Sequence, residues 1–223
     1  MSSWRTTERA PIIAAMADPE RVTSRIDLSA GRLEAFSDAV MAVIITILAL
    51  ELRTPEDSTW AAVQAWWPNL FIYILAFVFI AIYWNNHHHL LRATQRISSA
   101  VMWANMTLLF WLSLAPVVTE WIRTTPREGL PVASFGAVAL GAALSYTWLV
   151  RSLIRANGRD SMVARAVASD VKGYVSLALY ACALPLAAVS AWISYALYVA
   201  VAVMWLIPDR RFTRLEALEE GEG

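Results

Sequence analysis

The sequence of 223 residues predicts an all-α integral membrane protein with six transmembrane helices. Of these residues, 58% are hydrophobic and only 16% are charged, so a water-soluble domain of this length would not bury its long uncharged runs. Several runs approach or exceed the roughly 20 residues that a helix needs to cross a hydrocarbon core of about 30 Å. They are too long for barrel strands and do not alternate apolar with polar residues, which excludes a membrane β-barrel.

The first predicted helix, 32–52, holds only a short uncharged stretch, between Asp38 and Glu51. A helix with acidic groups near both ends of its apolar part is better placed inside a bundle, because other helices or water can then meet the charges. We therefore expect this helix to be central or to line a cavity. Three longer apolar helices follow, at 66–91, 98–121 and 130–154.

The last two helices are predicted at 171–187 and 190–207, within one apolar stretch that is too long for a single span. Pro185 and Ser190 mark the position where this stretch can fold into a hairpin. The six helices make up a predicted membrane domain, 31–208. Predicted tails flank it, at 1–30 and 209–223.

Basic residues predict the orientation of the helices. Fifteen of the 18 Lys and Arg residues lie in the N-terminal segment, in the loops after the second and fourth helices, or in the C-terminal tail. The alternate loops contain only Arg53, Arg123 and Arg127. Cytoplasmic loops are enriched in such residues, so both termini are predicted to be cytoplasmic in a multi-pass protein of the cell membrane. Membrane lipid is thus an expected partner, whereas a net charge of zero gives no basis for binding nucleic acid.

The first helix carries a narrow apolar stripe. At about 100° per residue, Val43, Ile47 and Leu50 point in similar directions, and Thr46 lies about 60° to one side. Asp38 faces elsewhere. Such a stripe either packs against neighbouring helices, as most do in membrane bundles, or lines a pore.

Polar residues of three helices are expected to meet near the cytoplasmic side. Glu34 and Asp38 are like charges one helical turn apart, which is unfavourable unless another helix supplies a partner. Trp84 and His88 lie one turn apart at the end of the second helix, and Asn105 interrupts the apolar third helix. Such a cluster either fastens the helices together or forms a functional site. The residues predicted to meet are Arg32, Ser37, Asp38, His88 and Asn105.

An ordered set of motifs resembles a known family. Arg32-x-x-x-Phe36-Ser37-Asp38 opens the first helix, and the later landmarks follow in order: Trp84-x-x-His87-His88, Asn105, Leu114-Ala115-Pro116 and Trp205-Leu206-Ile207-Pro208-Asp209. The set resembles the transmembrane protein 175 family of lysosomal and prokaryotic potassium channels, in its prokaryotic single-repeat form.

The resemblance implies a homotetramer in which the first helix of each copy surrounds a pore. In that arrangement Val43, Ile47 and Leu50 form a hydrophobic gate, and Thr46 takes part in ion selection. The resemblance also places seven residues behind the pore as an interhelical network: Arg32, Phe36, Ser37, Asp38, Trp84, His88 and Asn105. Permeant potassium is the only ligand implied, with no cofactor, and a carbonyl filter of the TVGYG type is absent. Val43 stands where the family usually has a longer side chain, so Ile47 or Leu50 is a candidate for the tightest ring.

Other functions receive less support from the sequence. His87, His88 and His89 point about 100° apart on a helix and do not close on one metal ion by themselves, so no metal site is predicted there. HExxH and GxSxG motifs are absent, and we do not expect an enzyme. The single cysteine, Cys182, excludes an intramolecular disulfide. The alternatives left open are a secondary transporter, a proton-permeable cation channel and a scaffold without flux.

Overall fold

The computed structural model describes residues 19–166 and 171–207, which form helices and short connections without any β-strand. The prediction of an all-α fold is therefore confirmed. Most of the predicted N-terminal tail and the whole C-terminal tail, 1–18 and 209–223, lie outside the described residues. The helices are α2 (Pro19–Glu51), α3 (Trp60–Arg92), α4 (Ser99–Ser113), α5 (Ala115–Thr124), α6 (Gly129–Asn157), α7 (Met162–Ala166), α8 (Val171–Val189) and α9 (Ala191–Leu206).

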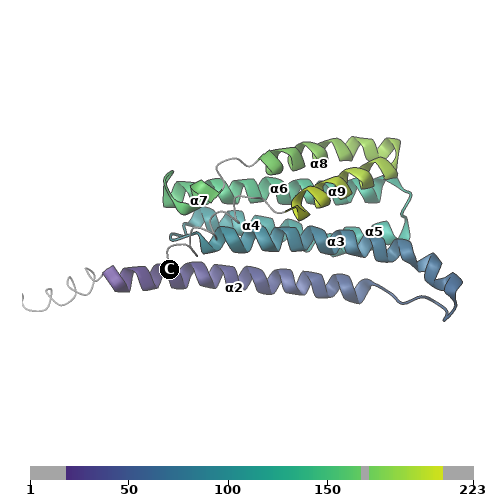
Figure 1. Cartoon of the computed structure of the whole chain (residues 1–223), viewed down its shortest axis with the longest axis horizontal. Helices are drawn as coiled ribbons and strands as arrows, with labels where there is room; N and C mark the ends of the chain where they lie inside the picture. Colours follow the sequence, from purple (N-terminus) through teal and green to yellow (C-terminus); the bar gives the residue numbers. More distant parts are fainter. Residues whose placement is uncertain (1–18, 167–170, 208–223) are drawn as a thin grey trace, which may run out of the picture.

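The long helices run side by side along the long axis of the molecule (Figure 1). α6 packs against both α4 and α8, and α8 packs against α9. α2 lies at one edge of the bundle, where it contacts α3, α4 and α5 (Figure 1). This position gives α2 neighbours on one side only within the described chain.

Two helices begin earlier than the sequence predicted. α2 starts at Pro19 rather than near residue 32, so part of the predicted N-terminal tail is helical. α3 starts at Trp60, where the side chain of Thr59 accepts a hydrogen bond of 3.2 Å from the Ala62 backbone N–H. Such a cap satisfies one of the four free N–H groups at a helix start, and it lets the helix begin upstream of Pro68.

The third predicted helix is divided by a proline. α4 ends at Ser113 and α5 begins at Ala115, with Pro116 in the first turn of α5. Pro116 has no N–H to donate to the Leu112 carbonyl, so the regular ladder is interrupted there. The two helices remain in line as one apolar segment, Ser99–Thr124.

The predicted helical hairpin at the end of the chain is confirmed. Ser190 alone separates α8 from α9, and its N–H donates to the Leu186 carbonyl at 2.9 Å. Ser194 then fastens the two arms, because its hydroxyl donates to the Ala183 carbonyl at 2.7 Å. Pro185 lies within α8 and does not end it. The short helix α7 was not predicted, since it carries no apolar run.

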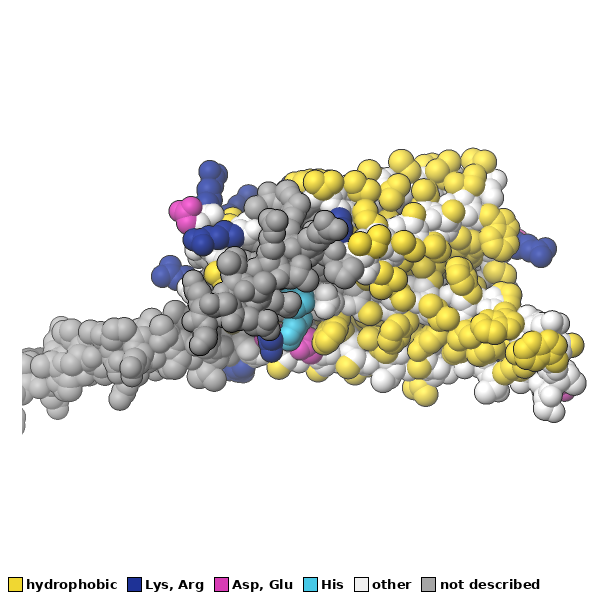
Figure 2. Space-filling model, in the orientation of Figure 1, with side chains coloured by type: hydrophobic (Ala, Val, Ile, Leu, Met, Phe, Trp, Pro, Cys, Tyr) yellow, Lys and Arg dark blue, Asp and Glu magenta, His cyan; other side chains and the backbone are white. Residues whose placement is uncertain are grey.

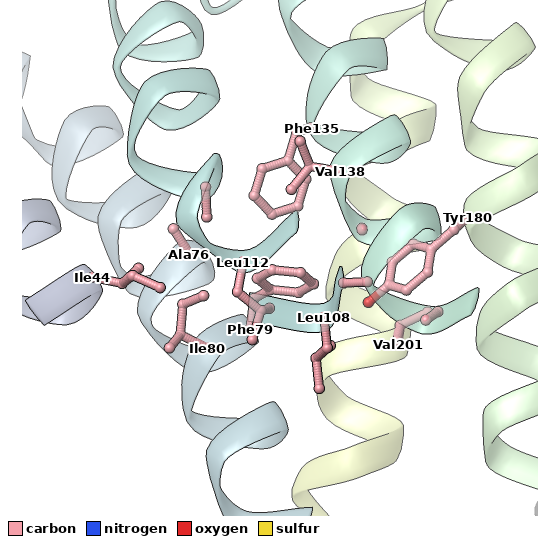
Figure 3. Packing of buried hydrophobic residues seen from close by; sticks show 14 of the residues in the cluster. Ile44, Ala76, Phe79, Ile80, Leu108, Leu112, Phe135, Val138, Tyr180 and Val201 are labelled. Carbon is pink, nitrogen blue, oxygen red and sulfur yellow. The ribbon is translucent and has the colours of Figure 1, made fainter. Parts of the chain in front are cut away.

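The buried core contains side chains from every helix of the bundle, α2 to α9, and Figure 3 shows part of it. Phe79 of α3 packs against Phe135 of α6, with ring centroids 5.5 Å apart, and Ile44 brings α2 to the same cluster. Lipid tails are as apolar as these side chains, so close packing rather than removal from water stabilises such a core in a membrane.

Five described segments are long and apolar enough to cross a membrane: Ala30–Glu51, Trp60–Arg92, Ser99–Thr124, Gly129–Asn157 and Val171–Val189. α9 is apolar but shorter, with 16 residues. Figure 2 shows a broad belt of hydrophobic side chains, with most of the visible basic side chains at one end. The chain is therefore a multi-pass membrane protein.

Candidate functional site

α2 has two faces with different environments. Its buried face consists of residues three or four positions apart, as a helix requires: Leu33, Ser37, Met41, Ile44 and Leu48. These side chains turn toward the bundle and fix α2 against its neighbours.

The opposite face of α2 is uncovered within one copy of the chain. Val43 is 56% exposed, Ile47 39% and Leu50 84%. Thr46 is also exposed, and its hydroxyl donates to the Val43 carbonyl at 2.7 Å. The stripe predicted from the sequence therefore takes no part in burying the core of a single copy. It remains available to another copy, to lipid or to a water-filled pore.

A buried polar chain joins α2, α3 and α4. The Ser37 hydroxyl donates to the Leu33 carbonyl at 2.8 Å and accepts from Asn105 Nδ2 at 2.9 Å. Asn105 Oδ1 lies 2.7 Å from His87 Nε2, which therefore acts as the donor. Ser37, His87 and Asn105 are completely buried. Polar groups that bond across helices in this way hold a membrane bundle in one arrangement.

The structure adds a histidine to this chain that was not among the residues expected to meet, while His88 lies beside Asp38 and Glu34. His87, rather than His88, contacts Asn105. Neighbouring helical residues point about 100° apart, so the rotation of α3 about its axis decides which histidine faces α4. Because this rotation depends on packing along the whole helix, the sequence pattern alone did not reveal it.

His88 belongs to a second polar group. Its Nδ1 atom lies 2.8 Å from Glu34 Oε1, and its ring stacks on Trp84 with centroids 5.8 Å apart. Asp38 is half-buried beside them. The side chains of Arg32, Phe36 and Trp84 are exposed at this end of the bundle.

Comparisons with known proteins identify the family. The family described as "Endosomal/lysosomal potassium channel TMEM175" matches residues 32–116. The chain is 43% identical over 187 residues to a potassium channel of Chryseobacterium sp. (strain P1-3), covering 84% of this chain and 97% of that protein. The chain belongs to the TMEM175 family.

Other relatives of this TMEM175 chain differ in the ion that their names give, and one solved structure shares its fold. A potassium channel of Streptomyces collinus is 32% identical over 133 residues, covering 56% of this chain and 65% of that protein. The human endosomal/lysosomal proton channel TMEM175 is 27% identical over 174 residues, 70% of this chain and 34% of that protein. The crystal structure of a lysosomal potassium-selective channel TMEM175 homologue from Chamaesiphon minutus matches with a TM-score of 0.71. That match has 23% identity and covers 80% of this chain and 97% of the other.

The opposite end of α2 in this TMEM175 chain holds a second group of charged residues, which the sequence analysis did not predict. Arg123 of α5 pairs with Glu120 one turn earlier, and its side chain is only 9% exposed. The Oε2 atom of Glu51 is buried nearby and has no hydrogen-bond partner among the described residues. The acidic end of α2 was visible in the sequence, but the approach of α5 to it depends on the tertiary packing.

Proposed function

We propose that four copies of this chain form a potassium-permeable channel whose pore is lined by α2. The observation that carries the proposal is the uncovered face of α2, on a helix whose other face is fully packed. Membership in a family of ion channels, whose relatives include proteins named potassium channels, supports it. The proposal includes six spans per copy, with α9 as the sixth, and both termini on the basic, cytoplasmic side.

The side chains on the uncovered face fit two neighbouring surfaces. At about 100° per residue, the exposed Ala35, Ala42 and Ala49 lie along one edge of the face, while Val43 and Ile47 lie along the other. Small side chains let helices approach closely, which suits the alanine edge for contact with a second copy. The bulkier edge would then point toward the axis of the assembly.

The proposed gate works by excluding water. Rings of Val43, Ile47 and Leu50 from four copies would enclose an aliphatic constriction, and such constrictions block ions when water leaves them. A modest rotation or dilation of α2 rewets the constriction and allows conduction. Closure by this gate comes from the loss of water and does not depend on a filter of backbone carbonyls.

Thr46 has the chemistry of a selectivity residue in this arrangement. Its hydroxyl proton is donated to the Val43 carbonyl at 2.7 Å, which leaves its oxygen lone pairs free to accept. An exposed hydroxyl oxygen oriented in this way can replace part of the hydration shell of a cation. Four such oxygens would form one polar ring within an otherwise aliphatic pore.

The test measures reversal potentials in planar bilayers containing the purified protein under a potassium/sodium gradient. We expect a reversal displaced toward the potassium equilibrium potential. Ile47→Asn should increase the current at least several-fold, because a polar ring holds water in the constriction. Ile193→Asn on α9 is the matched control, since Ile193 is 41% exposed and Ile47 is 39% exposed. Equal currents from both variants would contradict a gate at Ile47.

A proton-permeable channel is the second candidate, since the human relative is named a proton channel. A pH gradient in symmetric potassium distinguishes the two, because only proton permeation moves the reversal potential under that condition. A secondary transporter would instead give saturable, ion-coupled flux without ohmic single-channel steps.

A further inference from the structure

Glu34, Asp38 and His88 form a compact group where α2 meets α3. Each offers one ligand-type atom, a carboxylate oxygen or a ring nitrogen, and these atoms all lie within 4.8 Å of one another. No other three His, Cys, Asp or Glu residues meet in this way within the described ranges. Figure 2 shows histidine and acidic side chains together where the polar end of the molecule borders the apolar belt.

Two atoms of this group are buried without hydrogen-bond partners. Asp38 Oδ1 and His88 Nδ1 are both shielded from solvent, and neither is hydrogen-bonded to any described residue. His88 Nδ1 lies only 2.8 Å from Glu34 Oε1, but the contact does not have the geometry of a hydrogen bond. A nitrogen lone pair that close to a carboxylate oxygen is repulsive unless a proton or a cation lies beside both atoms.

The charges of the group also favour a cation. Glu34 and Asp38 are like charges one turn apart on α2, which destabilises the helix unless a positive group relieves them. Neither acid is ion-paired with a Lys or Arg of the part of the chain that the structure describes. His88 is therefore the only described side chain paired with this acidic turn.

The donor atoms fit one class of metal ion. One imidazole nitrogen with carboxylate oxygens suits divalent first-row transition metals, whereas Ca²⁺ takes six to eight oxygen ligands. Two ligand atoms 2.8 Å apart, each about 2.1 Å from an ion, subtend roughly a right angle there, so a single ion can contact both atoms. The stacked Trp84 ring holds the His88 ring in place. We propose that Glu34, Asp38 and His88 bind a divalent transition-metal ion of the zinc class, which joins α2 to α3.

This site differs from the three-histidine site that the sequence argued against. Only one of the consecutive histidines takes part, and the other two ligands come from a different helix. A bound ion adds a connection between α2 and the packed body of the bundle. If α2 lines the pore, as proposed above, the ion restrains the motion that opens it, and this consequence rests on the proposed function.

The binding test uses the full-length protein in detergent, stripped with a chelator and titrated with ZnCl₂ by calorimetry. We expect one Zn²⁺ per chain. His88→Gln and Glu34→Gln should each weaken the affinity at least tenfold, whereas the adjacent control His89→Gln should change it less than about twofold. CaCl₂ should produce no saturable binding at equal concentration. Circular dichroism confirms that each variant is folded, and a Zn²⁺-dependent rise of the thermal midpoint in the wild type should disappear in Glu34→Gln.

Equal Zn²⁺ affinity in the wild type, His88→Gln and Glu34→Gln would overturn the site. So would an equally large loss in His89→Gln, or Ca²⁺ binding as tight as that of Zn²⁺. In bilayers, Zn²⁺ should reduce the current of the wild type and of His89→Gln but spare that of Glu34→Gln. Zn²⁺ binding that depends on Glu34 and His88 supports the site even if the protein passes no current. The absence of current would refute the proposed channel and not the metal site.

Discussion

Removing Asn105 should destabilise the bundle mainly by leaving His87 without its partner. Asn105 is completely buried and holds two contacts across helices, at 2.9 Å to Ser37 and 2.7 Å to His87. In Asn105→Leu the volume is nearly kept, but the His87 Nε2–H has no acceptor, which costs about 1–3 kcal/mol. Ser37 stays hydrogen-bonded to the Leu33 carbonyl, so its share of the loss is small. We expect a total loss of about 2 kcal/mol in the free energy of unfolding.

A double-mutant cycle isolates the contact between the two side chains. Replacing both partners by apolar groups is far less costly than orphaning one, so His87→Leu with Asn105→Leu should lose about 1–2 kcal/mol less than the sum of the single losses. The assay is reversible unfolding in mixed micelles, followed by the fluorescence of the tryptophans. Asn86→Leu is the matched control, because the Asn86 side chain donates only to Ile82 within its own helix and should change stability by less than about 0.5 kcal/mol. Strictly additive losses at His87 and Asn105 would refute the reasoning.

Two further predictions concern local packing and capping. Gly141→Ala should destabilise the protein by about 1–3 kcal/mol, because a Cβ at this position would collide with the Trp111 ring. A Cβ at Gly31 would meet no atom within 4 Å, so Gly31→Ala should stabilise α2 by about 0.5–1 kcal/mol. Thermal unfolding compares the two variants, and similar shifts of their midpoints would contradict the packing argument. Thr59→Ala should lower the free energy of unfolding by about 1 kcal/mol and fray the start of α3, because it removes the acceptor for the Ala62 N–H. Amide hydrogen exchange should become faster in the first turn of α3 only. Unchanged protection in that turn would contradict the role of Thr59 as a cap.

The sequence predicted the helices well because their main signal, a long run without charge, is local. The hairpin at Ser190 follows the same logic, since a stretch too long for one span must fold back. The division at Pro116 is equally local and follows from the missing N–H, although the first interpretation treated 98–121 as one helix. Where a helix begins depends on capping, and Thr59 moved the start of α3 upstream of its strongest apolar run.

Relations between helices were harder to predict. The pattern placed Ser37 and Asn105 at one depth, and in the structure Asn105 Nδ2 donates to the Ser37 hydroxyl at 2.9 Å. It did not distinguish His87 from His88, since both lie at that depth and only the rotation of α3 separates them. The contact between His88 and Glu34 also depends on the rotation of α3 and was not predicted. Glu34 was treated as an unfavourable neighbour of Asp38, whereas the structure places it 2.8 Å from the His88 ring.

The two faces of α2 also bear on how the protein is made. The buried face of α2, including the Ser37–Asn105–His87 chain, is covered by helices of the same copy, so its burial does not require a second copy. The residues proposed to join copies are a separate set on the opposite face. In the proposed assembly, folding and association therefore depend on different residues: a change at Asn105 lowers the stability of each copy, whereas a bulky side chain at Ala42 disturbs the contact between copies.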